Sequence, residues 1–297
     1  SIPKYHSLLW RDARPSRNPC GRCQSSQACV VSCLPCFKVP ERLIEWAAGL
    51  TTIGRYNECA ILRGWKDTLD ACFLGIFDSR FDVDYGNVGA CRGAGISLET
   101  NTLYRNQQGG GFVDASFASR LGPPSRSTLA FGTDFFDIDH DGWLDLFVAT
   151  GHIEDRSWTG LEPYKMQPHL FRNDGHGRYR DLAAKSGSYF QSKWVGRGTA
   201  VGDVDRDGDL DLVVAHQVDP AKLLLNDTPG PRSSVIIKPV GNSLSPRSGI
   251  GVQVTAKGVT PVLMQHLAGG GSFQSASALE LHLGLSQRES FELIELT

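Results

Sequence analysis

Two nine-residue acidic stretches constrain this chain more than any other feature. The first reads DIDHDGWLD, from Asp137 to Asp145, and the second reads DVDRDGDLD, from Asp203 to Asp211. Two like charges about 4 Å apart repel by roughly 1 kcal/mol in water and by more in a protein. A folded chain that carries such a stretch twice therefore needs something that compensates the negative charge.

The acidic stretches belong to a longer internal repeat. FGTDFFDIDHDGWLDLFVA (131–149) returns as RGTAVGDVDRDGDLDLVVA (197–215). LYRN at 103–106 returns as LFRN at 170–173 and, more loosely, as LLLN at 223–226. Self-similarity on this scale is typical of architectures built from stacked structural units.

Each unit reads as β-structure. LDLFVAT and LDLVVAH are short β-branched or aromatic runs bounded by turn-forming residues, which is a strand signal. HLFRN and RYRDL flank a glycine-containing turn, which predicts a hairpin. Short strands in this order predict a propeller blade that is stabilised by stacking on its neighbours. The sequence thus predicts an all-β chain with a partial β-propeller over residues 96–228.

The spacing D-x-D-x-D-G-x-x-D predicts a cation site in each acidic stretch. Alternating aspartates in a tight turn can aim their oxygens at one point, and the glycine permits the sharp bend. Calcium fits best because it accepts six to eight oxygen ligands in flexible geometry, whereas magnesium prefers a strict octahedron. An EF-hand is excluded because position twelve is Val148 or Val214 instead of a bidentate glutamate.

The predicted calcium ligands are the same in both stretches. Side chains are expected from the four aspartates of the pattern, and a main-chain carbonyl from the residue after the glycine. The Asp209 side chain is expected to point to water. The predicted ligands are Asp137, Asp139, Asp141, Trp143 (carbonyl) and Asp145 in the first stretch, and Asp203, Asp205, Asp207, Asp209 (carbonyl) and Asp211 in the second.

The repeat, including the small residues before each acidic stretch, resembles the FG-GAP or VCBS repeats of integrin-type β-propellers. The resemblance covers roughly residues 101–228 and implies calcium between two strands of a blade. An earlier acidic stretch would be expected before LYRN. FDVDYGNVGACRGAG at 81–95 keeps Asp82 and Asp84 but loses the rest of the pattern.

The C-terminal part (234–297) alternates apolar and polar residues around glycine turns and predicts a small β-sandwich-like domain. PRSGIG at 246–251 and GGGSFQSASALELHLGLS at 269–286 resemble the ASPIC/UnbV domain. That domain commonly follows FG-GAP repeats in proteins similar to cartilage acidic protein and in bacterial secreted relatives. Pro246 stands where the family motif usually has asparagine, and a Trp-Pro-Ser-Gly stretch is expected after Thr297, so the chain resembles a fragment.

The N-terminal third (1–95) holds all eight cysteines and shows no sustained periodicity. CGRC at 20–23 and CLPC at 33–36, with Cys29 between them, have spacing that suits a structural zinc site. Disulfides in an oxidising compartment are a second interpretation. A third is that an altered reading frame produced this composition, with no defined site and an irregular structure.

The sequence shows no nucleophile elbow, metalloprotease helix or phosphate-binding loop, so it indicates no catalytic residue. A formal net charge of −2 gives no basic excess that would favour nucleic acid. No apolar run reaches the roughly 18 residues that a membrane span needs. The leading hypothesis is a secreted or cell-surface calcium-binding scaffold that binds an unidentified protein or glycan without catalysis.

Two other hypotheses remain open. One is a secreted polysaccharide-acting enzyme with structural calcium, which would need an acidic pair across a tryptophan-lined cleft away from the acidic stretches. Exposed tryptophans could stack on sugars, and the candidates are Trp143, Trp158 and Trp194. The other is a nucleic-acid binder with zinc at the N-terminal cysteines. Asn226-Asp-Thr is a candidate glycosylation sequence, meaningful only in a eukaryotic secretory route.

Overall fold

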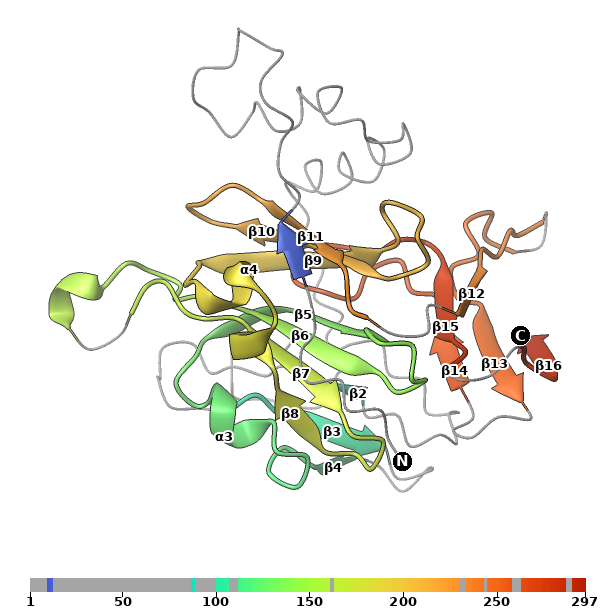
Figure 1. The fold of residues 1–297 in the computed structure, drawn as a ribbon, viewed down its shortest axis with the longest axis horizontal. Coiled ribbons are helices and arrows are strands. Elements are labelled where there is room, and N and C mark those ends of the chain that lie inside the picture. Colours follow the sequence, from blue (N-terminus) through green and yellow to red (C-terminus); the bar gives the residue numbers. More distant parts are fainter. Residues whose placement is uncertain are drawn as a thin grey trace, which may run out of the picture.

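The computed structural model describes residues 10–12, 87–88, 100–106, 112–160, 163–229, 233–242, 245–257, 263–286 and 290–297. All eight cysteines lie outside these residues, and so does the predicted zinc site. The described part is all-β, as the sequence predicts, and its strands form five sheets (Figure 1). The assignment of the sheets of the repeat region to blades of a partial propeller stays a prediction.

A four-stranded antiparallel sheet forms the centre of the repeat region, in the order β5-β6-β7-β8. In the β7–β8 hairpin Phe171 lies opposite Asp181, which confirms the predicted glycine turn. The strands are β5 (Ala130–Phe136), β6 (Asp145–Thr150), β7 (His169–Asn173) and β8 (Tyr179–Asp181).

The second repeat forms another four-stranded sheet, in the order β1-β11-β10-β9. The sequence predicted an irregular N-terminal third, yet this sheet takes its fourth strand from there: Trp10 pairs with Asn226. Trp10 is buried and packs edge-on against Phe136. The strands are β1 (Trp10–Asp12), β9 (Gly196–Gly202), β10 (Asp211–His216) and β11 (Lys222–Asn226).

A three-stranded sheet, β2-β3-β4, flanks the central sheet on its other side (Figure 1). Its strands are β2 (Asn87–Val88), β3 (Leu103–Asn106) and β4 (Phe112–Asp114). Four short helical turns connect the strands of the repeats: α3 (Gly122–Ser125), η2 (Ser157–Thr159), η3 (Ala183–Lys185) and α4 (Ser188–Gln191).

Both faces of the central sheet are buried, and β6 shows how the sequence achieves this. Side chains alternate between the faces of a strand. Phe147 and Ala149 join a hydrophobic cluster shared with β9–β11, whereas Leu146 and Val148 join one shared with β3. An uninterrupted apolar run is therefore required at this position, as is usual for strands covered on both sides.

A glycine lets the two repeats approach closely along β5 and β9. A Cβ atom at Gly132 would lie 2.7 Å from Cγ2 of Thr199 and closer still to the carbonyl oxygen of Arg197. Any larger residue would force the strands apart. The small residue before the first acidic stretch is therefore required for packing between β5 and β9.

The C-terminal unit (residues 233–297) contains two small antiparallel sheets, β12-β15 and β14-β13-β16. It has its own hydrophobic cluster, which includes Val254, Leu263 and Leu283. Its strands are β12 (Ser234–Ile237), β13 (Gln253–Lys257), β14 (Leu263–His266), β15 (Leu281–Gly284) and β16 (Leu293–Leu296).

A row of serines joins the C-terminal unit to β5 and β9. Ser272 Oγ accepts a hydrogen bond from the Thr133 amide at 3.0 Å. Ser275 Oγ accepts one from the Thr199 amide at 3.1 Å, and Ser277 Oγ one from the Val201 amide at 3.0 Å. Backbone donors that a neighbouring strand could have used are satisfied here by side-chain hydroxyls.

Asp134 lies in the middle of this junction. Its carboxylate accepts hydrogen bonds from the hydroxyls of Thr199 and Ser277. Burial raises the pKa of Asp134 to about 7, although hydrogen bonds from the hydroxyls act in the opposite direction. The folded protein therefore holds a proton at this site that the unfolded chain loses near pH 4.

Asp134→Asn should remove part of the pH dependence of stability. Because the folded pKa of Asp134 is raised, its contribution to stability is complete below about pH 4 and is lost as the pH rises through 7. Urea unfolding from pH 4 to pH 7.5 should show a fall for wild type that is steeper than for the variant, by on the order of 3 kcal/mol over the range. Asp155→Asn is the matched control, since the pKa of Asp155 is lowered. Identical slopes for wild type and Asp134→Asn would contradict the assignment.

Candidate metal centres

The first acidic stretch, called loop 1 (residues 137–145), connects β5 to β6 and is held by its own carboxylates. Asp137 Oδ2 accepts a hydrogen bond from the Gly142 amide at 2.9 Å. Asp145 Oδ2 accepts one from the Ile138 amide at 3.1 Å. Two of the aspartates thus fold the loop back on itself, as aspartates in turns commonly do.

The second stretch, called loop 2 (residues 203–211), connects β9 to β10 and repeats these hydrogen bonds. Asp203 Oδ2 accepts from the Gly208 amide at 3.2 Å, and Asp211 Oδ2 from the Val204 amide at 2.8 Å. The glycines have φ of +88° at Gly142 and +96° at Gly208, where a side chain would be strained. The two loops therefore share one backbone design.

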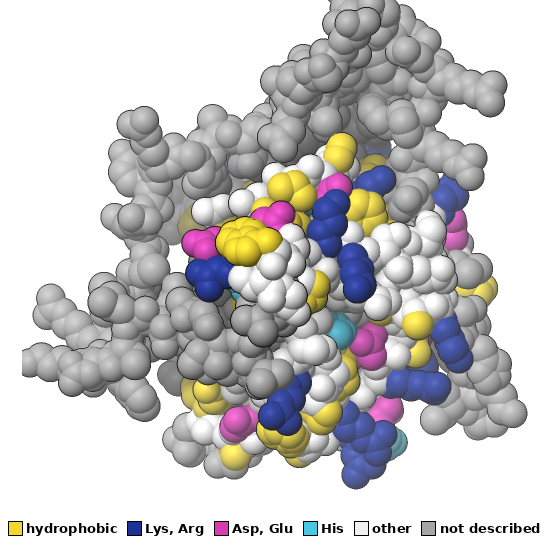
Figure 2. Space-filling model, turned by 90° about the vertical axis from the view of Figure 1, so that its left-hand side faces the viewer, with side chains coloured by type: hydrophobic (Ala, Val, Ile, Leu, Met, Phe, Trp, Pro, Cys, Tyr) yellow, Lys and Arg dark blue, Asp and Glu magenta, His cyan; other side chains and the backbone are white. Residues whose placement is uncertain are grey.

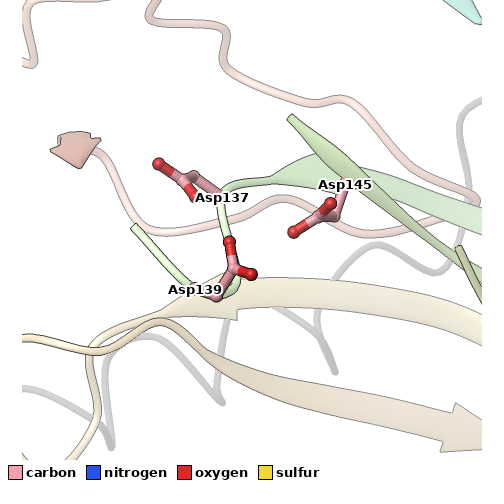
Figure 3. Close-up of side chains that lie close together, drawn as sticks. All are labelled: Asp137, Asp139 and Asp145. Atoms are coloured by element: carbon pink, nitrogen blue, oxygen red, sulfur yellow. The ribbon is translucent and has the colours of Figure 1, made fainter. Parts of the chain in front are cut away.

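Three carboxylates converge in each loop. Asp137, Asp139 and Asp145 offer oxygens that lie within 4.8 Å of one another, and so do the equivalent aspartates of loop 2, which are Asp203, Asp205 and Asp211. Figure 3 shows the three loop 1 carboxylates gathered from the loop and from the start of β6. Such spacing allows one cation to contact all three side chains.

Each loop also holds a buried carboxylate oxygen without a hydrogen-bond partner. These oxygens are Asp139 Oδ1 and Asp203 Oδ1. The Asp139 side chain is only 4% exposed, so water does not satisfy its oxygen. Leaving a buried charged acceptor unpaired is costly, which is the condition that a bound cation relieves. With an all-oxygen donor set, the residues fit calcium.

The two loops differ in burial and in local charge. Asp137 and Asp145 are 2% and 0% exposed, whereas Asp205 and Asp207 of loop 2 are exposed. Arg172, the arginine of LFRN, donates to Asp139 Oδ2 at 2.6 Å and to Asp141 Oδ2 at 3.1 Å. The second repeat has leucine at the equivalent position, so this partial compensation belongs to loop 1 alone.

Several carboxylates in each loop have raised pKa values. Burial, followed by the charges of Asp141 and Asp139, raises the pKa of Asp137 well above its ordinary value. Burial and the charge of Asp139 raise the pKa of Asp141 to about 7. In loop 2, burial raises the pKa of Asp211 to about 7. Each is the expected response of crowded, desolvated carboxylates.

Some predicted ligands lie outside the converging groups. Asp141 and Asp207 do not belong to them; the Oδ1 atoms of these residues accept the amides of Trp143 and Asp209, at 2.9 Å and 3.0 Å. Their role as direct ligands stays a prediction, and so does that of the carbonyls of Trp143 and Asp209.

The prediction that the Asp209 side chain points to water is wrong. Asp209 is 3% exposed, and its Oδ1 lies 3.5 Å from Nε2 of His140 in loop 1. The alternation of residues within one strand cannot reveal this contact, because it joins two loops that are far apart in the sequence.

Two asparagines that the sequence analysis did not identify hold the last aspartate of each loop by a hydrogen bond. The backbone amide of Asn173 donates a hydrogen bond to Asp145 Oδ1 at 2.7 Å, and the backbone amide of Asn226 donates one to Asp211 Oδ1 at 2.9 Å. The Asn226 side chain also donates to the carbonyl of Ile138 at 2.9 Å, which links the second repeat to loop 1. The repeated asparagine at the end of LFRN and LLLN was the sequence signal that could have identified these two residues.

The same burial argues against glycosylation of Asn226. Asn226 is 2% exposed and Thr228 is 4% exposed, and the Asn226 side-chain nitrogen is engaged in a hydrogen bond to Ile138. A glycan at this position is incompatible with the folded arrangement.

The histidines of the repeats lie in separate local networks. His169 bonds Asp181 through Nδ1 at 2.6 Å and Thr128 through Nε2 at 3.0 Å, and it stacks on Phe171. His216 bonds the carbonyl of Pro220 at 2.9 Å. Both networks connect ends of strands to adjacent turns, so no common site forms between these two histidines.

Comparison with known proteins identifies the C-terminal unit. Residues 242–297 match the family model described as ASPIC and UnbV. This confirms the resemblance predicted from PRSGIG and the glycine-serine stretch, for that part of the chain. No curated protein matches the chain. The FG-GAP resemblance and the similarity to cartilage acidic protein stay predictions.

The described residues contain no helix that is both long and apolar enough to cross a bilayer.

Without bound cations, the protein should become less stable as the pH rises. The folded pKa values of Asp141 and Asp211 lie above those of the unfolded chain, so their contribution to stability is complete below about pH 4 and is lost on passing pH 7. Cation-free protein should lose on the order of 2 kcal/mol or more of unfolding free energy between pH 5 and pH 8, measured by urea unfolding. Saturating calcium should flatten this slope, and equal stability of the cation-free protein at both pH values would contradict the explanation.

Proposed function

We propose that this chain is a calcium-binding scaffold of an extracellular or cell-surface protein, which uses a rigid β-framework to bind another macromolecule. The observation that carries the proposal is the pair of loops with matching hydrogen bonds. In each loop three carboxylates converge, and one of the three has a buried oxygen without a hydrogen-bond partner. Two equivalent sites in two repeats are difficult to explain as ordinary solvated turns.

Calcium is preferred over other cations because of the donor set and its geometry. All predicted ligands are oxygen atoms, which favour hard cations such as calcium and magnesium over metals that prefer sulfur or imidazole ligands, such as zinc and copper. Both oxygens of Asp137 and both oxygens of Asp145 already accept backbone amides, so a bound cation would share hydrogen-bonded oxygens and must tolerate irregular coordination. Calcium does so more readily than magnesium. Its role is structural: it neutralises the carboxylates and fixes β5 to β6 and β9 to β10.

The repeat region is best interpreted as FG-GAP or VCBS blades followed by an ASPIC/UnbV domain. The match of residues 242–297 to ASPIC and UnbV supports this interpretation and is consistent with an extracellular protein of the repeat type. Extracellular calcium is plentiful, and modules outside the cell commonly bind it with dissociation constants of about 10⁻⁴–10⁻³ M. The location and the blade assignment are parts of the same proposal.

A protein or glycan partner would contact the loops that project from the sheets. The connection between β6 and β7 projects furthest at the left of Figure 1, and Trp158 within it is 79% exposed. On the face shown in Figure 2, basic, acidic and hydrophobic side chains are interspersed. A mixed surface of this kind suits a protein or glycan better than nucleic acid, which favours a concentrated basic patch. No catalytic role is proposed.

Removal of calcium should lower the melting temperature markedly. The cation compensates the repulsion among three carboxylates in each loop, so its loss should destabilise both connections between strands. Differential scanning fluorimetry in excess EGTA should show a decrease of about 5 °C or more, reversed by added calcium but not by magnesium at the same concentration. A shift of less than about one degree would contradict a structural role for calcium.

Replacing Asp139 and Asp205 together by alanine should abolish calcium binding in isothermal titration calorimetry. Each substitution removes one of the three converging carboxylates of its loop. The single variants should each bind one equivalent fewer than wild type, which should bind two. Asp155→Ala is the control because Asp155 is an exposed aspartate outside both loops. Undiminished stoichiometry in the double variant would show that the ligands are assigned wrongly.

A further inference from the structure

The C-terminal unit lies directly against loop 1. In Figure 1 the turn between β5 and β6 points toward β14 and β15, and in Figure 3 a pale red trace from the C-terminal part passes beside Asp137. A Cβ atom at Gly284 would lie 2.7 Å from Cα of His140 and closer still to Asp137 Oδ2. This contact leaves no room for a side chain at position 284 of β15.

A second contact closes the same side of the loop. A Cβ atom at Gly142 would lie 3.3 Å from Cδ2 of Leu263, at the start of β14. The narrow cleft between the two parts is lined by Asp137, Gly142, Leu263 and Gly284 among others. Packing of β14 and β15 against the loop accounts for the near-complete burial of Asp137, which is 2% exposed.

Loop 2 meets the same unit differently. The Gly208 carbonyl accepts hydrogen bonds from His282 Nε2 at 2.7 Å and from Ser234 Oγ at 3.1 Å. Asp205 and Asp207 nevertheless stay exposed. The C-terminal unit therefore covers the Asp137 carboxylate of loop 1 and leaves Asp205 and Asp207 of loop 2 open to solvent.

The two parts share no buried hydrophobic cluster among the described residues, although Phe131 of β5 packs edge-on against Phe273. The cluster of the C-terminal unit is separate from the two clusters of the repeat region. Close backbone packing and hydrogen bonds connect the parts. The fit consequently depends on the shape of loop 1, and that shape depends on whether its carboxylates converge or repel one another.

We propose that cation binding in loop 1 and docking of the C-terminal unit are one coupled equilibrium, in which β14 and β15 act as the cover of the site. The inference rests on the proposed function, and the buried, unpartnered Asp139 Oδ1 marks loop 1 as the site. A cation draws the carboxylates together and fixes His140 and Gly142 in the positions that Gly284 and Leu263 fit. By thermodynamic linkage, docking raises the cation affinity of loop 1 by the same factor.

Hydrogen–deuterium exchange of the full chain tests the coupling from the metal side. Calcium should slow amide exchange in peptides covering 263–284 at least tenfold in wild type. Asp205→Ala, which disables loop 2, should retain this protection, whereas Asp139→Ala should lose it. Exchange in 263–284 that is equal with calcium and with chelator, or equal loss of protection in both variants, would overturn the proposal.

Gly284→Ala tests the coupling from the side of the cover. In the Asp205→Ala background, where loop 1 is the remaining site, Gly284→Ala should weaken calcium binding at least tenfold in calorimetry. Gly271→Ala in the same background is the matched control, since a Cβ atom at Gly271 meets nothing within 4 Å. Equal affinities in the two variants would sink the coupling. Should Gly284→Ala fail to fold, as judged by circular dichroism, the exchange experiment decides alone.

Failure of this proposal is distinguishable from failure of the proposed function. If wild type binds no calcium in calorimetry, the function itself is wrong. If wild type binds two equivalents but amide exchange in 263–284 is unchanged by calcium, the calcium sites are correct and the coupling to docking of the C-terminal unit is wrong.

Discussion

Mutual repulsion among carboxylates is the constraint on which the rest of the structure depends. Each acidic loop uses carboxylate oxygens to accept backbone amides and also holds a buried oxygen without a hydrogen-bond partner, which is Asp139 Oδ1 in loop 1 and Asp203 Oδ1 in loop 2. The hydrogen bonds supply the shape, but they do not remove the charge. Without a counter-charge, the raised pKa values of Asp137, Asp141 and Asp211 make folding less favourable at neutral pH than at acid pH; in the proposed function, calcium supplies that counter-charge.

The two repeats meet this constraint unequally. In loop 1, Asp137 is buried against the C-terminal unit, and Arg172 partly neutralises the loop through its contacts with Asp139 and Asp141. Loop 2 lacks the arginine, and its outer aspartates are exposed to water, which screens their charges. The same aspartate pattern therefore gives a largely buried loop in the first repeat and a more exposed loop in the second. The difference arises from what packs on each loop, and the motif contains no sign of it.

The junctions between the parts are polar and closely packed. Serine hydroxyls from the C-terminal unit satisfy backbone amides of β5 and β9, and the partly buried Asp134 lies among them. Gly132 and Gly284 mark the two places where backbones approach too closely for a side chain. Hydrogen-bonding geometry and fit, more than shared hydrophobic core, thus determine how the C-terminal unit sits on the repeats.

The sequence by itself determined the local features: the all-β class, the strands LDLFVAT and LDLVVAH, the glycine hairpin, and the ASPIC/UnbV resemblance at residues 242–297. These depend on periodicity and turn chemistry within a few residues. The tertiary structure alone decided that Trp10–Asp12 completes the second sheet, that Asp209 is buried beside His140, and that Asn226 supports both loops. Each of these joins segments distant in the chain, where burial depends on the packing partner and not on the local pattern.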